Sequence, residues 1–65
     1  MVQTGRYENH EDGHDKCWQL TKTKAGYEAH WGRCGGIMQG PKVYSEAEAE
    51  KVVKQKLAKG YEYVG

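Results

Sequence analysis

The stretch Ser45-Glu-Ala-Glu48 places the strongest limit on how this chain folds. A serine followed three residues later by a glutamate is typical of a capping box, and acidic residues in the first turn suit the helix dipole. The sequence therefore predicts a helix over residues 46–59, which Gly60 ends as a left-handed cap. The apolar residues at helical spacing, which predict the face that packs on the rest of the domain, are Ala49, Val52, Val53 and Leu57.

The residues before Ser45 carry strand patterns. Residues 16–23 alternate, with Trp18 and Leu20 on one side, as in a half-buried strand. We expect a hairpin turn at Ala25-Gly26, a strand over residues 27–33 and a further strand at 42–44. Residues 8–15 are polar and predict a loop between strands. Gly32 marks a bulge or a close approach by another backbone segment.

Strands followed by one helix predict an α+β fold: a small antiparallel sheet of about four strands with one C-terminal helix packed on one face. Residues 61–64 return as a short final strand or an extended tail. Residues 1–65 form a single domain, in which we expect residues 1–5 to fray. Leucine and isoleucine are scarce beside two Trp and five Tyr, so aromatic rings must supply much of the buried area.

Charge and cysteine content limit the environment of the chain. The net charge is +1, with acidic residues near both ends of the sequence and a basic middle. No apolar stretch approaches the roughly 20 residues of a membrane helix, and no signal-peptide pattern is present, so we expect a cytoplasmic location. Cys17 and Cys34 would then stay reduced, because a disulfide scaffold of this size normally carries more cysteines.

The sequence offers little for catalysis, a cofactor or a metal. No nucleophile with a neighbouring base and no phosphate-binding glycine motif can be identified, so we do not expect an enzyme or a bound cofactor. The acidic loop at residues 11–15 lacks the spacing of a calcium site. Zinc ligation is disfavoured by poor spacing of the thiol and imidazole groups His10, His14, Cys17, His30 and Cys34.

The segment Trp31-Gly32-Arg33 is the best candidate for a functional site. Residues two apart on a strand project from one face, so the alternation places an indole and a guanidinium on the same side of the sheet. Such a pair can stack on a sugar or base and hold a phosphate. Alternatively, Trp31 fills a thin core together with Tyr27 and Ala29, as we expect for Trp18, while Arg33 pairs with a carboxylate such as Glu28.

These residues, with their neighbours, resemble the WGR domain family. The matching motifs are Arg6-Tyr7-Glu8, Lys16-Cys17-Trp18, Trp31-Gly32-Arg33 with Gly35, Gln39, Tyr44-Ser45 and residues 56–61, which end in Lys-Gly-Tyr. Such domains lie beside the catalytic region of DNA-dependent poly(ADP-ribose) polymerases and occur in small bacterial and phage proteins. The resemblance implies an antiparallel sheet with one helix, and a role in binding DNA ends or breaks.

Carried over residue by residue, the resemblance makes Trp31 the stacking residue and Arg33 a phosphate or partner contact, with Lys16 and Lys42 as further cationic candidates. Two positions depart from the family pattern. Asp15 stands where Asn is frequent and would repel a phosphate, and Met38 stands where Gly is frequent and would change the shape of the loop.

Two classes of function follow. The first is a non-enzymatic nucleic-acid-binding module that recognises a DNA end, a nick or a single-stranded terminus. The alternative is a protein-protein interaction module that uses the same Trp31 and Arg33 surface, because Trp and Arg are enriched at interface anchors. A third option is a homodimer through an exposed sheet edge, so that the chain is a monomer or a weak homodimer.

Overall fold

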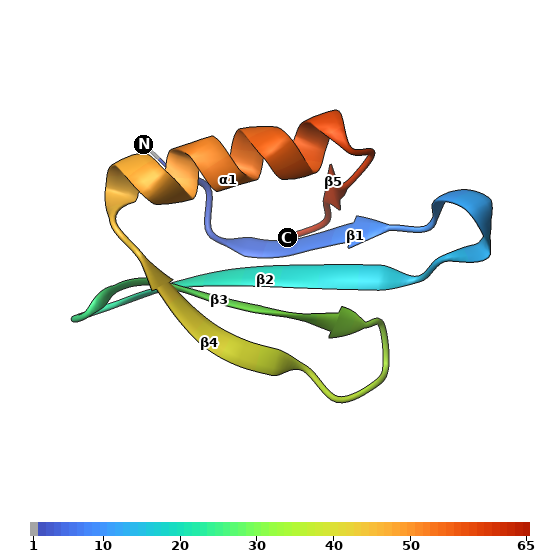
Figure 1. Ribbon diagram of the computed structural model, residues 1–65, viewed down its shortest axis with the longest axis horizontal. Helices are drawn as coiled ribbons and strands as arrows, with labels where there is room; N and C mark the ends of the chain where they lie inside the picture. Colours follow the sequence, from blue (N-terminus) through green and yellow to red (C-terminus); the bar gives the residue numbers. More distant parts are fainter. Residues whose placement is uncertain (1) are drawn as a thin grey trace.

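The computed structural model describes residues 2–65, and its strands form one five-stranded antiparallel sheet in the order β4-β3-β2-β1-β5 (Figure 1). The α-helix α1 follows the first four strands and packs on one face of the sheet. The α+β expectation is confirmed, with one strand more than the four expected. In chain order the elements are β1 (Gly5–Asn9), the short 3₁₀ helix η1 (Glu11–Gly13), β2 (Lys16–Thr23), β3 (Gly26–Arg33), β4 (Gln39–Tyr44), α1 (Glu46–Ala58) and β5 (Glu62–Tyr63).

The central hairpin matches its prediction most closely. Strand β2 has the predicted bounds, and β3 starts one residue earlier than expected, because the turn lies at residues 24–25. Strand β4 is longer than predicted and includes Gly40 and Pro41. It lies at the edge of the sheet, where a residue without a backbone N–H is tolerated.

The predicted loop at residues 8–15 is shorter than expected, because strand β1 extends into it. Glu8 and Asn9 pair with Cys17 and Lys16 in the β1–β2 ladder. Polarity was misleading here, because Glu8 lies on the sheet face opposite the helix, where a charged strand residue is compatible with solvent. At the N-terminus, Val2 packs against the core and the Tyr63 hydroxyl donates a hydrogen bond to the Thr4 carbonyl. The expected fraying of residues 1–5 stays a prediction, and Met1 lies outside the described residues.

The capping box of helix α1 is confirmed. The Glu48 backbone N–H donates to the Ser45 hydroxyl, and the Glu48 carboxylate accepts from the Ser45 backbone N–H. Gly60 follows the last turn with φ +100°, as expected for a left-handed cap. The expected inner face is correct for Ala49, Val52 and Val53. It is wrong for Leu57, which is 49% exposed.

The core lies between the helix and the sheet face that carries the largest rings. Tyr7 and Trp18 are directly opposite each other in the β1–β2 ladder, with ring centroids 5.4 Å apart in an edge-on arrangement. Trp18 is 2% exposed, which confirms it as a core residue. Aromatic rings supply half of the buried cluster, as expected from the composition; its members are Tyr7, Trp18, Leu20, Tyr27, Ala29 and Ala49.

Cys17 and Cys34 form a disulfide, so the expectation that both stay reduced was wrong. That expectation came from the number of cysteines, whereas the decisive factor is register. Cys17 lies opposite Gly32 in the β2–β3 ladder, and Cys34 follows two residues later. The resulting Cα–Cα distance of 5.0 Å lies within the range that a disulfide bridges.

Among residues 2–65, no helix has both the length and the apolar character needed to cross a lipid bilayer.

Candidate functional site

Trp31 is half-buried, and its position is set by strand β3 and by the edge strand β4. It lies directly opposite Trp18 in the β2–β3 ladder and packs against the core. A side chain at Gly40 would place its Cβ 3.1 Å from Cζ3 of the indole and 2.7 Å from the Ala29 carbonyl oxygen. The indole is therefore positioned by its packing against the core on one side and by the close backbone of Gly40 in β4 on the other.

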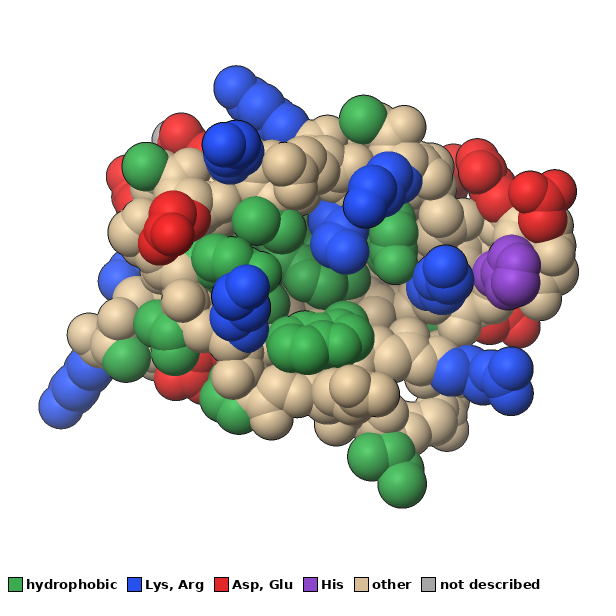
Figure 2. Space-filling model, in the orientation of Figure 1, with side chains coloured by type: hydrophobic (Ala, Val, Ile, Leu, Met, Phe, Trp, Pro, Cys, Tyr) green, Lys and Arg blue, Asp and Glu red, His purple; other side chains and the backbone are tan. Residues whose placement is uncertain are grey.

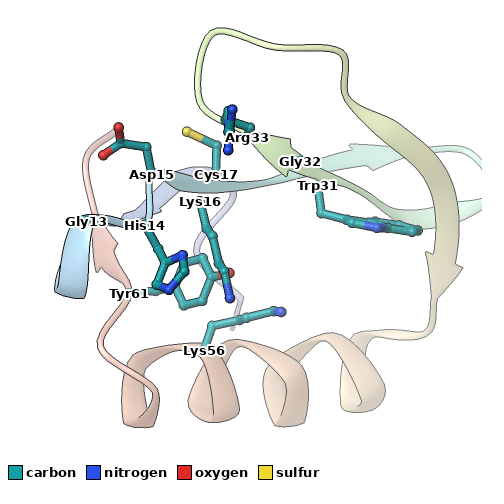
Figure 3. A pocket seen from close by; sticks show the side chains of 10 residues that line it. All are labelled: Gly13, His14, Asp15, Lys16, Cys17, Trp31, Gly32, Arg33, Lys56 and Tyr61. Carbon is teal, nitrogen blue, oxygen red and sulfur yellow. The ribbon is translucent and has the colours of Figure 1, made fainter.

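Two of the cavities on the helix side of the sheet are both lined by Trp31 and Lys56. The larger, of about 490 Å³, lies between the start of β2, the end of β3 and the C-terminal half of α1 (Figure 3). The smaller, of about 300 Å³, is bordered by β4 and α1 and is also lined by Lys42, Tyr44 and Lys59. We call the two cavities together the Trp31 groove.

Cationic side chains surround the Trp31 groove. Figure 2 shows Lys and Arg side chains around a central apolar hollow on this face of the molecule. Asp15 is the only carboxylate among the described residues that line the two cavities. The cations that line them are Lys16, Arg33, Lys42, Lys56 and Lys59.

The groove brings together all four residues that the sequence predicted for the site. Trp31, Arg33 and Lys16 line the larger cavity, and Lys42 lines the smaller one. Arg33 is exposed and lies opposite Lys16 in the β2–β3 ladder. Among residues 2–65, Arg33 has no ion pair, so the alternative pairing with Glu28 is not present.

The indole and the guanidinium line the same cavity but are not adjacent. Alternation along β3 predicts that Trp31 and Arg33 project from one face of the sheet. Figure 3 nevertheless shows the Arg33 side chain at the end of β3, apart from the Trp31 ring. Lys16 and Lys56 instead extend into the space between the Tyr61 ring and the indole. A ligand that covers the ring would meet these two ammonium groups first.

Lys56 is the main functional candidate that sequence reasoning missed. Its ammonium nitrogen lies 5.1 Å from the centroid of the Tyr61 ring and 5.9 Å from that of Trp18. Burial lowers the pKa of Lys56, and the neighbouring charges of Lys59 and Lys16 lower it further. The helical spacing of Val52, Lys56 and Lys59 could have indicated this role. It places both lysines on the same side of the helix as Val52, an apolar residue of the predicted inner face.

Gly32 is required by a close backbone approach, as expected. A Cβ at this position would lie 2.7 Å from the Ile37 carbonyl oxygen and 3.4 Å from the Met38 Cα. The loop over residues 34–38 therefore folds back against β3. The register shift of the β3–β4 ladder lies between Ala29 and Trp31 rather than at Gly32.

Asp15 does not act as a bare negative charge in the groove. Its Oδ1 lies 2.7 Å from Nδ1 of His10, and the other ring nitrogen of His10 lies 2.8 Å from Oε1 of Glu8. The hydrogen bond to Asp15, followed by that to Glu8, raises the pKa of His10. Figure 3 shows the Asp15 carboxylate directed away from Lys16 and Lys56.

The possible metal ligands that lie close together in the structure differ from the thiol and imidazole groups considered in the sequence analysis. Ligand atoms of Glu8, Cys17 and Cys34 lie within 4.8 Å of one another, but both sulfur atoms are joined in the disulfide. A thiolate is the form of cysteine that binds zinc, so this group offers one carboxylate in the oxidised state.

Comparisons with known proteins add no relatives. No protein-family model matches the sequence, and neither a curated protein nor a solved structure matches the chain. The likeness to WGR domains therefore stays a prediction from the residues quoted above.

Proposed function

We propose that this chain is a WGR-type, non-enzymatic module that binds nucleic acid, most favourably a DNA end, nick or single-stranded terminus. One observation carries the proposal: a half-exposed indole lies in a groove whose lining contains five cationic side chains and one carboxylate, which is itself paired with His10. Stacked aromatic rings beside ammonium groups are what a terminal nucleotide needs, because its base or sugar stacks and its phosphates are neutralised.

The roles divide by position in the groove. Trp31 provides the stacking surface, and Lys16 and Lys56 neutralise phosphates next to it. Lys42 and Lys59 extend the cationic border along β4 and the end of α1. Arg33 contacts the nucleic acid at a greater distance from its stacked terminus. The ligand enters as a terminus because an intact duplex keeps its bases stacked and offers no free face to an indole.

The test is a titration of labelled nicked, blunt, single-stranded and intact duplex DNA with the wild-type protein and with Trp31→Ala at low salt. Loss of base stacking should weaken binding by about 1–3 kcal/mol, or roughly 5- to 150-fold. The proposal fails if the wild type binds none of these DNAs, or if folded Trp31→Ala binds equally well.

A matched pair of lysine variants tests the groove itself. Lys56→Gln removes a cation that lines the groove, whereas Lys51→Gln removes an exposed cation of the same helix outside it. Lys56→Gln should lower the affinity and reduce the slope of log K against log salt by about one. Equal effects of the two substitutions would contradict a groove-specific contact.

The same surface is the candidate for the alternative function, docking on a partner protein. A pull-down with and without nuclease separates the two functions, because binding that survives nuclease is not mediated by nucleic acid.

The cytoplasmic location also stays a prediction. Disulfides persist mainly in oxidising compartments, so a cytoplasmic protein would have its Cys17–Cys34 bond reduced or in exchange with cellular thiols. Alkylating free thiols before cell lysis reports which state is present.

A further inference from the structure

The two sulfur atoms of the disulfide have different surroundings. Cys17 is only 1% exposed, whereas Cys34 is half-buried and begins an exposed loop. The next two residues, Gly35 and Gly36, have no side chains to cover it, and a Cβ at Gly35 would meet no atom within 4 Å. A thiol from solution can therefore approach Cys34 but not Cys17.

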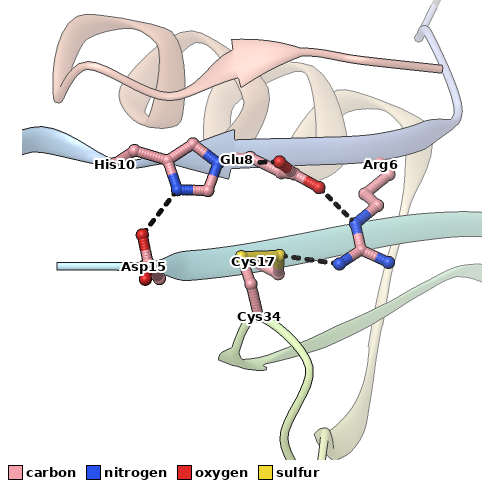
Figure 4. The surroundings of a disulfide bond; sticks show 6 residues. All are labelled: Arg6, Glu8, His10, Asp15, Cys17 and Cys34. Carbon is pink, nitrogen blue, oxygen red and sulfur yellow. Dashed lines mark hydrogen bonds and ion pairs between the residues drawn. A yellow bond between two sulfur atoms is a disulfide. The ribbon is translucent and has the colours of Figure 1, made fainter.

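A guanidinium lies against the buried sulfur. Nη2 of Arg6 donates to Sγ of Cys17 at 3.0 Å, while Nε of Arg6 donates to Oε2 of Glu8 at 2.7 Å (Figure 4). A disulfide sulfur is a weak acceptor, but a thiolate at the same place would be a strong one. The contact therefore gains strength when Cys17 carries a negative charge.

We propose that Cys34 is a thiol-exchange site, at which a small thiol attacks while Cys17 leaves as a thiolate held by Arg6. This inference is independent of the proposed nucleic-acid function. The attacking thiolate, already deprotonated in solution, forms a bond to Sγ of Cys34. The Cys17–Cys34 bond breaks, and its electron pair stays on Sγ of Cys17. A second thiolate of the same class then attacks the mixed disulfide, releases Cys34 as a thiolate and leaves the two small thiols oxidised to their disulfide.

Two charges near the sulfur atoms act in opposite directions. Arg6 stabilises the leaving Cys17 thiolate, and a more stable leaving thiolate departs faster. The Glu8 carboxylate, which has a ligand atom within 4.8 Å of both sulfurs, opposes this charge. His10 contacts Glu8 and Asp15 and partly offsets those carboxylates. Removing Arg6 and removing Glu8 should therefore change the exchange rate in opposite senses.

The experiment follows the reaction of the oxidised, full-length protein with glutathione, quenched with N-ethylmaleimide and mapped by mass spectrometry after trypsin. Cleavage at Lys16, Lys22, Arg33 and Lys42 separates the two cysteines into the peptides 17–22 and 34–42. We expect glutathione on peptide 34–42 and maleimide on peptide 17–22. Glutathione on peptide 17–22, or exchange only after the chain is unfolded in denaturant, would overturn the proposal.

Rate measurements on variants test the leaving-group role. Arg6→Gln should slow formation of the mixed disulfide roughly tenfold, the scale of a lost hydrogen bond to a charged group. Glu8→Gln should raise the rate, and Lys24→Gln, which removes an exposed charge at the hairpin turn, should not alter it. Equal rates for Arg6→Gln and the wild type would contradict the role of Arg6. The peptide map of the wild type tests the attack on Cys34 even if a variant fails to fold.

Discussion

The missing side chain at Gly40 determines where the Trp31 indole can lie. The residue has φ +108°, and a Cβ there would lie 2.7 Å from the Ala29 carbonyl oxygen and 3.1 Å from the indole. The site therefore depends on a residue that offers no functional group. A functional search that looks only for charged and aromatic residues overlooks such a position.

We expect Gly40→Ala to destabilise the protein by about 2 kcal/mol or more, because it combines backbone strain with a steric clash. Urea unfolding measures the loss, and tryptophan fluorescence reports displacement of the indole. Gly13→Ala is the control, since Gly13 also has a positive φ but a Cβ there meets no atom within 4 Å. It should cost about 1 kcal/mol. Equal losses in the two variants would show that the clash is unimportant.

His10 links stability to pH. Hydrogen bonds to Asp15 and then Glu8 raise its pKa above the ordinary 6.5, so the protonated ring stabilises the folded state. That contribution is fully present below pH 6.5 and is lost as the pH rises through the folded-state pKa. The pKa of Glu8 is lowered, by His10 first and then by Arg6, so its contribution is lost at acidic pH instead.

The wild type should therefore lose stability between mildly acidic and mildly alkaline pH, and His10→Gln should show a flatter profile over that range. Denaturant unfolding at a series of pH values measures both proteins. A wild-type profile that superimposes on that of His10→Gln would exclude this coupling.

At the scale of elements, helix α1 depends on its N-terminal cap. The Ser45 hydroxyl accepts from the Glu48 backbone N–H, and the backbone N–H of Ser45 lowers the pKa of Glu48 by donating to its carboxylate. The helix carries Lys56, and Lys59 at its C-terminal cap, to the Trp31 groove, so a frayed helix would also disturb the site.

We expect Ser45→Ala to destabilise the protein by about 1 kcal/mol, because a hydroxyl that satisfies a free helix N–H is lost. Ser45→Asp retains an acceptor at this position and should lose much less. Urea unfolding compares the two variants, and the cap would be unimportant if Ser45→Ala unfolded at the wild-type urea concentration.

At the scale of the whole molecule, the disulfide joins two cysteines with a sequence separation of 17 in a domain with a thin core. Such a closure restricts the unfolded chain by an amount worth about 3 kcal/mol. The bond ties the start of β2 to the loop after β3. Cys17 borders the larger cavity of the Trp31 groove, although Figure 3 shows its sulfur on the opposite side of the strand from Lys16 and Lys56. Loss of the disulfide should therefore destabilise the fold and loosen the strand ends that border the Trp31 groove.

Reduction of the wild type should therefore lower the free energy of unfolding by about 3 kcal/mol. Denaturant unfolding with and without reductant measures the difference. The double variant Cys17→Ala and Cys34→Ala should have a free energy of unfolding close to that of the reduced wild type. Addition of reductant should not change that value. Identical unfolding curves for the oxidised and reduced wild type would contradict this expectation.

Much of the fold could be read from the sequence because its signals are local. Alternation in residues 16–23 and the capping box at Ser45 depend on neighbours within a few positions, and both match the structure. The start of β4 could not be predicted, because Gly40 and Pro41 are tolerated only through the edge position of that strand. The disulfide was missed because its geometry follows from the register of β2 and β3.

The candidate site was predictable only in part for the same reason. Trp31, Lys16 and Arg33 come from paired neighbouring strands, and alternation predicts that they share one face. Lys56 comes from the helix, and its approach to the groove depends on how the helix packs on the sheet. The pairing of Asp15 with His10 likewise depends on the conformation of the loop between β1 and β2.

Strand β4 exposes one edge of the sheet, and its irregularities have a consequence for self-assembly. Pro41 lacks a backbone donor, and Lys42 is charged and exposed. The pairing of β4 with β3 also shifts register between Ala29 and Trp31, opposite these residues. An incoming strand from another copy would find an interrupted row of donors and acceptors and a charge to bury. This border thus discourages open-ended, amyloid-like growth, and concentrated solutions of the oxidised protein should stay free of fibrils.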